Sequence, residues 1–411
     1  MCGITGFWDI RHKQLSYSFQ KIIENMTDVL KSRGPDDKGI WIDKKNNISF
    51  GHRRLSIIEL SKLGKQPMKS HSKRYVISFN GEIYNFLYLK KELELEGVKF
   101  VSNSDTEVLI EALEKWGIQR TLLRITGMFA FSLWDKKNKK LYLARDRFGI
   151  KPLYFSFYDK TLLFGSQTKS FLKYPNWKNE ISFNALASFL KLGYIPSNQS
   201  IFKNTSQILP GHYMVVSSTG KIEQKCYWNL RNVVEKVKNK KINNFDVKNK
   251  VEDLLKKSVK KHMVSDVPIG SFLSGGVDSS LITALMQSQS IDKIKTFNIG
   301  FEEKTLDESK HAYKIAKYLG TEHYNVQFSN RDIIDLIPRL NSIYDEPFAD
   351  SSQLPTILLS NITKRKVKVA LSGDGGDELF GGYNRYNWAK KIKLFYNLPF
   401  TLRKLFGKSF K

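Results

Sequence analysis

Two hydrophobic patterns follow one another along the chain. Up to about residue 217, short runs rich in aromatic and β-branched residues alternate with turn-forming residues, which is typical of strands. The predicted strands are Ile48–Ile58, Arg74–Asn80, Gly127–Trp134, Lys140–Arg145, Leu162–Gly165 and Tyr213–Ser217. Ser104-Asp105-Thr106-Glu107 has the pattern of a capping box, and apolar residues follow it at helical spacing. This part is therefore predicted to be β-rich with a few helices.

The pattern changes after a polar, lysine-rich stretch at residues 229–250. Short apolar strands then alternate with helices, which favours a parallel sheet covered by helices. The predicted strands are Ile269–Leu273, Ile294–Ile299 and Val367–Leu371, and the predicted helices are Val251–Lys261, one from Ser279, and Glu308–Leu319. We expect a first domain at 1–228, a linker at 229–250 and a second domain at 251–411.

Composition limits the class of protein. The 411 residues are enough for two domains, and 41% hydrophobic residues fit a protein with buried cores. No apolar run approaches the ~18 residues of a membrane helix, and the first residues contain no apolar core of a signal peptide. The only cysteines, Cys2 and Cys226, make no disulfide framework. A reducing, cytoplasmic location is expected.

The charge is strongly basic, with 67 Lys and Arg against 40 Asp and Glu and a net charge of +27. Such a charge is compatible with nucleic-acid binding. The lysines are spread over the whole chain, however, and no nucleic-acid-binding motif is present. A solvated lysine-rich surface is therefore the favoured interpretation, and it would still attract anionic substrates.

Cys2 is the first candidate for chemistry. If Met1 is removed, Cys2 carries both a thiol and the free α-amine of the chain. An α-amine has a pKa of ~8 and can take the proton of the thiol beside it. The thiolate is the nucleophile, and pairing with an N-terminal amine is a known catalytic arrangement.

Asn80-Gly81 follows a predicted strand and offers a side-chain and a backbone N–H to a developing oxyanion. Glycine allows a substrate to approach the backbone closely. Taken alone, Asn-Gly more often marks a hairpin turn.

Two glycine-rich segments lie after predicted strands of the second part. In Ser274-Gly275-Gly276-Val277-Asp278-Ser279-Ser280, backbone N–H groups and a helix N-terminus can hold an anion. Asp278 would meet phosphate through Mg²⁺, which prefers oxygen ligands. The second segment runs from Ser372 to Tyr383. Both lie at carboxyl ends of strands, where open α/β sheets bind ligands.

Several separated motifs together resemble one enzyme family. They are Cys2-Gly3-Ile4, Arg33-Gly34-Pro35-Asp36, His52–Ile57, Asn80–Asn85, Asp105-Thr106-Glu107 and Arg145–Tyr154. The set resembles the glutaminase domain of glutamine-hydrolysing asparagine synthetases. The Ser274 segment resembles the pyrophosphate loop of ATP pyrophosphatases, and the Ser372 segment a second asparagine synthetase signature. The resemblance implies an α+β N-terminal-nucleophile hydrolase sandwich followed by an α/β parallel-sheet ATP-pyrophosphatase domain (adenine nucleotide alpha hydrolase-like).

The resemblance also implies residue roles in the first domain. Cys2 would attack the glutamine amide, and Asn80 and Gly81 would form the oxyanion hole. The glutamine-binding residues would be Arg54 for the α-carboxylate, Glu82 and Asp105 for the α-ammonium, and Ile57 and Ile58 as lining.

In the second domain, the resemblance implies an ATP site and a Mg²⁺ site. The ATP-binding residues would be Leu273, Ser274, Gly275, Gly276, Asp278, Ser279, Ile299, Ser372 and Gly373. Asp278 and Asp377 would hold Mg²⁺ and pyrophosphate, and Asp374 would help to form an acyl-adenylate. The run Asp345–Ser352 would border the acceptor or ATP site.

The implied reaction is glutamine-dependent asparagine synthesis from aspartate, with ATP as substrate and Mg²⁺ as cofactor. Family members extend beyond residue 411, so the synthetase half is expected to be incomplete. The alternatives are an amidotransferase with another carboxylate acceptor, such as a sugar uronate, and a glutaminase-only remnant. A non-enzymatic regulatory protein that binds glutamine or nucleotide and a nucleic-acid-binding module are further alternatives. The expected partners are small molecules, without nucleic acid or membrane. The oligomeric state stays open, with a homodimer as one arrangement.

Overall fold

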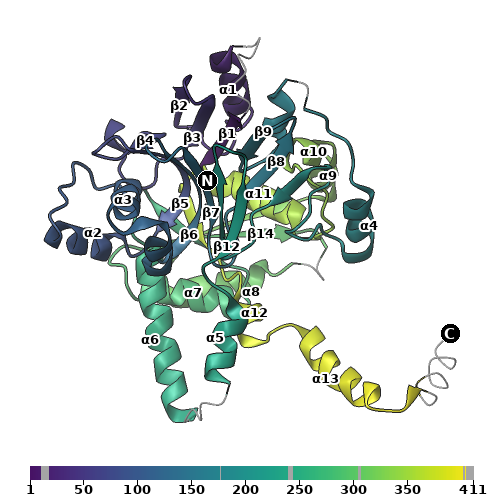
Figure 1. Ribbon diagram of the computed structural model, residues 1–411. Coiled ribbons are helices and arrows are strands. Elements are labelled where there is room, and N and C mark those ends of the chain that lie inside the picture. Colours follow the sequence, from purple (N-terminus) through teal and green to yellow (C-terminus); the bar gives the residue numbers. More distant parts are fainter. Residues whose placement is uncertain (11–17, 176, 239–243, 304–306, 401–402, 404–411) are drawn as a thin grey trace. The chain divides into compact units, whose positions relative to one another are not determined.

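The computed structural model describes residues 1–10, 18–175, 177–238, 244–303, 307–400 and 403 (Figure 1). These residues form two compact units, which are described separately. The first unit contains Met1–Val267 and Ile333–Thr356. The second contains Pro268–Asp332 and Ile357–Lys411.

Two antiparallel sheets form the centre of the first unit (Figure 1). The strands of one sheet, in spatial order, are β10 (Thr205–Gln207), β8 (Tyr154–Tyr158), β9 (Thr161–Gly165), β1 (Gly3–Asp9), β3 (Ile48–Arg54) and β2 (Asp37–Asp43). Those of the other are β12 (Ile222–Cys226), β11 (His212–Ser217), β7 (Lys140–Arg145), β6 (Gly127–Asp135), β5 (Tyr75–Ile83) and β4 (Met68–Lys69). Every residue of β1 and β9 is buried, because both faces of their sheet are covered.

The helices complete a layered sandwich. The α-helices that lie within this unit are α1 (Phe19–Asp28), α2 (Phe86–Leu95), α3 (Asp105–Arg124), α4 (Phe183–Leu192), α5 (Leu230–Val237), α6 (Asn244–His262) and α10 (Leu340–Ile343). Short 3₁₀ helices are η1 (Lys62–Gly64), η2 (Thr168–Lys173) and η3 (Ile337–Arg339). One apolar core lies between the two sheets, with Trp8 against Trp134. A second core joins the β5 sheet to α2 and α3, and a third joins the β1 sheet to α1.

The second unit is built on a four-stranded parallel sheet. Its spatial order is β15 (Glu322–Phe328), β14 (Lys295–Phe301), β13 (Ile269–Phe272) and β16 (Val369–Leu371). Its helices are α7 (Val277–Gln287), α8 (Ser309–Leu319), α12 (Gly376–Phe380) and α13 (Asn384–Tyr396). Helices α9 (Asn330–Ile334) and α11 (Gln353–Thr363) each cross the boundary between the units. The antiparallel sandwich followed by a parallel sheet confirms the predicted fold class.

Two local predictions differ from the structure. The strand predicted as Ile48–Ile58 ends at Arg54, because the next backbone N–H groups turn to side chains: Leu55 N donates to Cys2 Sγ and Ser56 N to Asp36 Oδ2. The capping box does not close. Ser104 caps α3, but the Glu107 carboxylate instead accepts bonds from Ser102 and His71.

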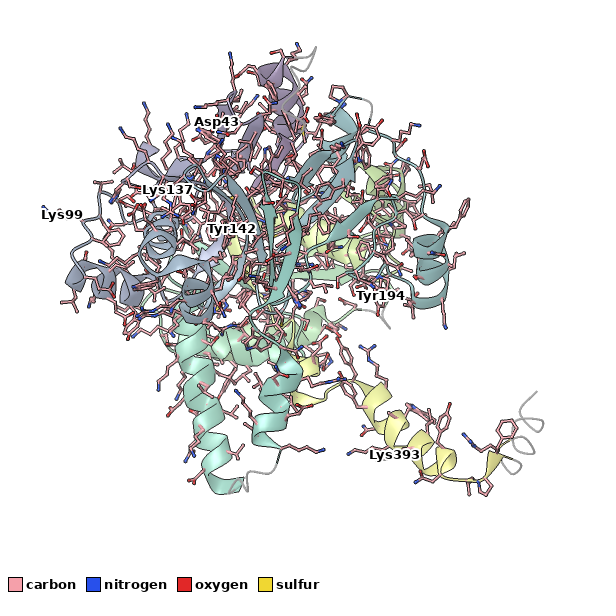
Figure 2. All side chains as sticks on the ribbon, in the orientation of Figure 1. Asp43, Lys99, Lys137, Tyr142, Tyr194 and Lys393 are labelled. Carbon is pink, nitrogen blue, oxygen red and sulfur yellow. The ribbon has the colours of Figure 1, made fainter. Side chains whose placement is uncertain are left out.

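Residues 229–250, the predicted linker, contain α5 and the start of α6, while 239–243 lie outside the described residues. Among the described residues, no helix has the length and apolarity needed to cross a membrane. Figure 2 shows Lys99, Lys137 and Lys393 extending outward, and all three are exposed. This placement agrees with the interpretation of the lysines as a solvated surface.

Candidate active site

Cys2 stands immediately before β1, beside the backbone of Leu55 and the side chain of Arg33. Leu55 N lies 3.4 Å from Cys2 Sγ, and Arg33 Nε donates to the Cys2 carbonyl oxygen at 2.9 Å. Burial raises the pKa of the Cys2 thiol, whereas the Leu55 N–H bond and, through space, the terminal amine lower it. Burial lowers the pKa of the Met1 amine to about 6. The thiol is therefore held next to a backbone donor, and burial disfavours its ionised form.

Asn80 and Gly81 lie in β5, opposite Ala130 and Phe129 of β6. Asn80 is 1% exposed, and neither Nδ2 nor Oδ1 has a hydrogen-bond partner among the described residues. A buried amide without partners carries a free-energy cost that a bound ligand would remove. At Gly81, a Cβ atom would lie 2.2 Å from the backbone oxygen of Met128, so only glycine fits. The strand therefore presents an unsatisfied donor beside a position without a side chain.

Glu82 and Asp105 are predicted site residues with buried carboxylates. Burial raises the pKa of Glu82 to about 7, and repulsion by Asp105 adds to the effect. Burial also raises the pKa of Asp105 to about 6, although Asp105 accepts a bond from Ile83 N at 3.0 Å. Among the described residues, no Lys, Arg or His forms an ion pair with either carboxylate. A substrate cation would lower both pKa values by supplying the missing charge.

Arg54 is the last residue of β3 and is 6% exposed. Its guanidinium donates to the backbone carbonyl groups of Ile58, Glu59 and Ser61. It therefore shapes the loop that contains Ile57 and Ile58, both of which are half-buried. Its electrostatic effects reach both Cys2 and Asp105.

Two cations belong to this cluster although the sequence analysis gave them no role. Arg33 holds the Cys2 carbonyl oxygen, and its Nη2 lacks a partner among the described residues. Lys151 is 5% exposed, and burial lowers its pKa. Lys151 interacts electrostatically with both Glu82 and Cys2. Arg33 lies in the Arg-Gly-Pro-Asp motif and Lys151 in the Arg145–Tyr154 motif. Membership in these motifs was the sequence feature that could have identified both cations as site residues.

In the second unit, the two glycine-rich loops follow β13 and β16, which are neighbouring parallel strands. Ser274 Oγ lies 2.9 Å from Ser279 Oγ, and Gly275 has a φ of +93°, a conformation that favours glycine. The loops touch one another. A Cβ atom at Gly376 would lie 2.5 Å from the Asp278 carboxylate, and one at Gly373 would lie 2.7 Å from Ser279 N.

The remaining predicted residues of this unit lie around these loops. Leu273, directly after β13, and Ile299, inside β14, are both buried. Ser372 Oγ donates to Asp374 Oδ2 at 2.8 Å, and Asp374 is exposed. Asp377 is the second residue of α12, after Gly376, and is half-buried. The structure thus brings Asp278 against the second loop, and each of these residues except Ile299 lies in or directly beside one of the two loops.

Asp345 and Glu346, at the start of the Asp345–Ser352 run, lie in the first unit. The Asp345 carboxylate accepts bonds from Gln167, Thr168 and Lys169, and Lys169 Nζ also pairs with it at 3.0 Å. The Glu346 carboxylate accepts bonds from Tyr154, Ser200 and Ile201. Both side chains anchor segment 333–356 to the sandwich.

Comparisons with known proteins identify both parts of the chain. The family profile of the glutamine amidotransferase domain matches residues 1–228, and that of asparagine synthase matches residues 250–409. Two solved structures resemble the chain at low identity. The Bacillus subtilis glutamine phosphoribosylpyrophosphate amidotransferase has a TM-score of 0.41 at 16% identity, covering 79% of this chain and 65% of that one. An allosteric regulatory enzyme of purine biosynthesis has a TM-score of 0.43 at 14% identity, with 80% of each chain covered.

Two curated relatives extend over nearly the whole chain. Glutamine-hydrolysing asparagine synthetase 1 of Bacillus subtilis is 36% identical over 405 residues, which cover 98% of this chain and 62% of the relative. A putative glutamine-hydrolysing asparagine synthetase 2 of Methanocaldococcus jannaschii is 36% identical over 426 residues, covering 98% and 79%. The chain thus spans less than two thirds of the first relative. On these matches, the chain belongs to the family of glutamine-hydrolysing asparagine synthetases.

Proposed function

We propose that the first unit hydrolyses glutamine and releases ammonia. The Cys2 thiolate would attack the side-chain amide carbon, and the tetrahedral oxyanion would accept bonds from Asn80 Nδ2 and Gly81 N. The C–N bond then breaks, and the nitrogen leaves as ammonia with the proton taken from the thiol. Water hydrolyses the resulting thioester to glutamate and restores the thiol.

The observation that carries this proposal is the set of unsatisfied groups around Cys2. Glutamine has an α-ammonium for the buried pair Glu82 and Asp105, and an amide oxygen for the unpartnered Asn80. Arg54, the proposed partner of the α-carboxylate, would have to exchange part of its bonding to the 58–61 loop. The α-ammonium and the side-chain amide of glutamine would thus each meet an unsatisfied group, while its α-carboxylate would compete with the loop carbonyl groups for Arg54.

Activation of the thiol would depend on removal of Met1, which transfers the α-amine to Cys2. We expect wild-type protein without Met1 to release glutamate and ammonia from glutamine, and Cys2→Ala to release neither. Intact mass measurement of the same samples reports on Met1. A fully active sample that retains Met1 would contradict the proposed activation.

The second unit would bind ATP and activate a carboxylate as an acyl-adenylate, which ammonia then converts to an amide. Asp278 and Asp377 supply the carboxylate oxygens that Mg²⁺ prefers, and the backbone of the second loop closes on Asp278. Mg²⁺ would neutralise the phosphate charge. Ser274, Ser279, Ser372 and the loop N–H groups would orient the phosphates. Asp374 would lie at the adenylate, and Leu273 and Ile299 would contact the nucleotide.

The proposed acceptor is aspartate, which would give asparagine, AMP and pyrophosphate. Wild-type protein with glutamine, ATP, Mg²⁺ and aspartate is expected to form equal amounts of asparagine and AMP. AMP release with another carboxylate, such as a sugar uronate, but not with aspartate would replace the acceptor. Glutamate without AMP for any acceptor would leave only the glutaminase proposal.

A further inference from the structure

Gln66 lies between the two halves of the proposed glutamine site and contacts both through one side-chain amide. Its Oε1 accepts a hydrogen bond from Phe79 N at 2.7 Å, and its Nε2 donates to Thr106 Oγ1 at 3.2 Å. Phe79 directly precedes Asn80, and Thr106 directly follows Asp105. The amide therefore links the oxyanion-binding part of β5 to the carboxylate at the start of α3.

The position of Gln66 is fixed from several sides. The β4–β5 register, with Met68 opposite Ile77, brings Gln66 opposite Phe79 when it is continued by two residues. The Gln66 backbone oxygen does not complete that ladder, because it lies against Gly39 of β2, where a Cβ would approach to 1.8 Å. The side chain therefore takes the place of the missing strand bond. Gln66 is 5% exposed, so water does not substitute for either partner.

The other polar group of Phe79 is also held by a side chain. His52 Nε2 lies 3.0 Å from the Phe79 carbonyl oxygen, and burial lowers the pKa of His52 to about 4. The imidazole is neutral at physiological pH, so Nε2 must carry the proton that it donates. Asn80 itself has no side-chain partner among the described residues. Asn80 and Gly81 are thus held by the β5–β6 pairing on one side and follow Phe79, whose N–H is held by Gln66, on the strand.

We propose that Gln66 is a positioning residue of glutamine hydrolysis that sets the distance between the oxyanion-binding peptide of β5 and the Asp105 carboxylate. This inference rests on the proposed glutaminase function. A substrate that uses both groups at once, as glutamine does, depends on this distance. A small reagent that needs only the Cys2 thiol does not.

The test compares two reactions of the same residue in the full-length protein. Gln66→Met keeps the volume and removes both hydrogen bonds, and we expect kcat/KM for glutamine to fall about 100-fold, as for a small misplacement of reacting groups. Alkylation of Cys2 by iodoacetamide is expected to stay within about twofold of wild type. Alkylation is measured on the Cys2 peptide by mass spectrometry, because the exposed Cys226 also reacts.

A matched pair at Thr106 separates positioning from loss of stability. Thr106→Val keeps the shape but removes two bonds of the hydroxyl, the one accepted from Gln66 and the one donated to Asp105 Oδ1 at 3.4 Å, whereas Thr106→Ser keeps the hydroxyl. We expect Thr106→Val to lose glutamine hydrolysis while its Cys2 is still alkylated at the normal rate. Thr106→Ser should retain both glutamine hydrolysis and alkylation. If Gln66→Met does not fold, the Thr106 pair still tests the chain of bonds that runs from Gln66 through Thr106 to Asp105, and equal kcat/KM for Thr106→Val and wild type would overturn the proposal.

The possible failures are distinct. Wild-type protein that does not hydrolyse glutamine would overturn the proposed function. The positioning role would be overturned if the wild type is active and either Gln66→Met or Thr106→Val has the same kcat/KM for glutamine as the wild type. Parallel loss of alkylation and glutamine hydrolysis would also overturn it, because it would indicate a general distortion of the Cys2 site.

Discussion

Replacing Glu82 by glutamine should stabilise the protein and weaken glutamine binding at the same time. Burial and the nearby Asp105 raise the pKa of Glu82 from 4.5 to about 7. A raised pKa means that the folded protein holds this proton more tightly than the unfolded chain does. The corresponding stability is present below pH 4.5 and is lost as the pH rises through about 7.

The magnitude follows from the two pKa values. A change from 4.5 to about 7 corresponds to about 3 kcal/mol of unfolding free energy, which the wild type loses above pH 7. Glu82→Gln has no proton to lose. We therefore expect its stability relative to wild type to rise by up to about 3 kcal/mol between about pH 4.5 and about pH 8.5. Urea unfolding at both pH values measures this difference.

Glutamine binding should change in the opposite direction. The neutral amide cannot pair with the α-ammonium as a carboxylate does, so KM at about pH 8.5 should rise roughly 10- to 100-fold. In wild type, KM should also rise as the pH falls below about 7, because Glu82 becomes protonated. In Glu82→Gln, KM should not rise near pH 7. It should rise only near pH 6, where Asp105 becomes protonated.

Glu346→Gln is the matched control. Glu346 accepts bonds from three donors in the same unit, so its replacement should reduce stability and leave the pH dependence of KM unchanged. The reasoning is refuted if Glu82→Gln is no more stable than wild type at alkaline pH. It is equally refuted if the KM profile of Glu82→Gln keeps its inflection near pH 7.

Further substitutions test the other parts of the sites. Asn80→Ala should lower kcat for glutamine about 100- to 1,000-fold with little change in KM, and an unchanged kcat would exclude Asn80 as an oxyanion donor. Gly81→Ala places a Cβ 2.2 Å from a backbone oxygen and should cost about 1–3 kcal/mol together with glutaminase activity. Gly97 lies in open space at a φ of +87°, so Gly97→Ala should lower the unfolding free energy by about 1–2 kcal/mol but leave kcat intact. Equal losses of kcat in Gly81→Ala and Gly97→Ala would refute the role given to Gly81. Gly376→Ala pushes against Asp278 and should abolish AMP release while glutamine hydrolysis continues, as separate assays of AMP and glutamate would show.

Much of the fold is predictable because its strands and helices have distinct local patterns. The strand at Lys140–Arg145 lies within the predicted bounds, and β6 extends one residue beyond them. Strand β1 was not predicted, because Gly3 and Gly6 interrupt its apolar residues and glycine is depleted in strands. Helix α5 lies in the predicted linker, where its apolar residues Leu230, Val233 and Val234 remain exposed, so no burial pattern distinguished them.

The candidate site was less predictable than the fold, because its properties arise from tertiary contacts. Motifs could name Cys2 and Asn80, but the lack of partners around Asn80 depends on packing across two sheets. The role of Arg33 at the Cys2 carbonyl joins residues 31 positions apart. The Gln66 contacts join β5 and α3, and no local pattern at Gln66 indicates them.

The carboxylates of the first unit show how the structure separates a binding site from an anchor. Glu82 and Asp105 are buried with raised pKa values and no ion pair among the described residues, so their ionisation destabilises the free protein. Asp345 and Glu346 each accept several hydrogen bonds, and Asp345 pairs with Lys169, so their charges are compensated within the fold. In sequence, each of the four is an acidic residue within a recognised motif. A bound cation would therefore stabilise the ionised forms of Glu82 and Asp105 most, which supports the proposal that they bind the α-ammonium of glutamine, whereas Asp345 and Glu346 hold segment 333–356.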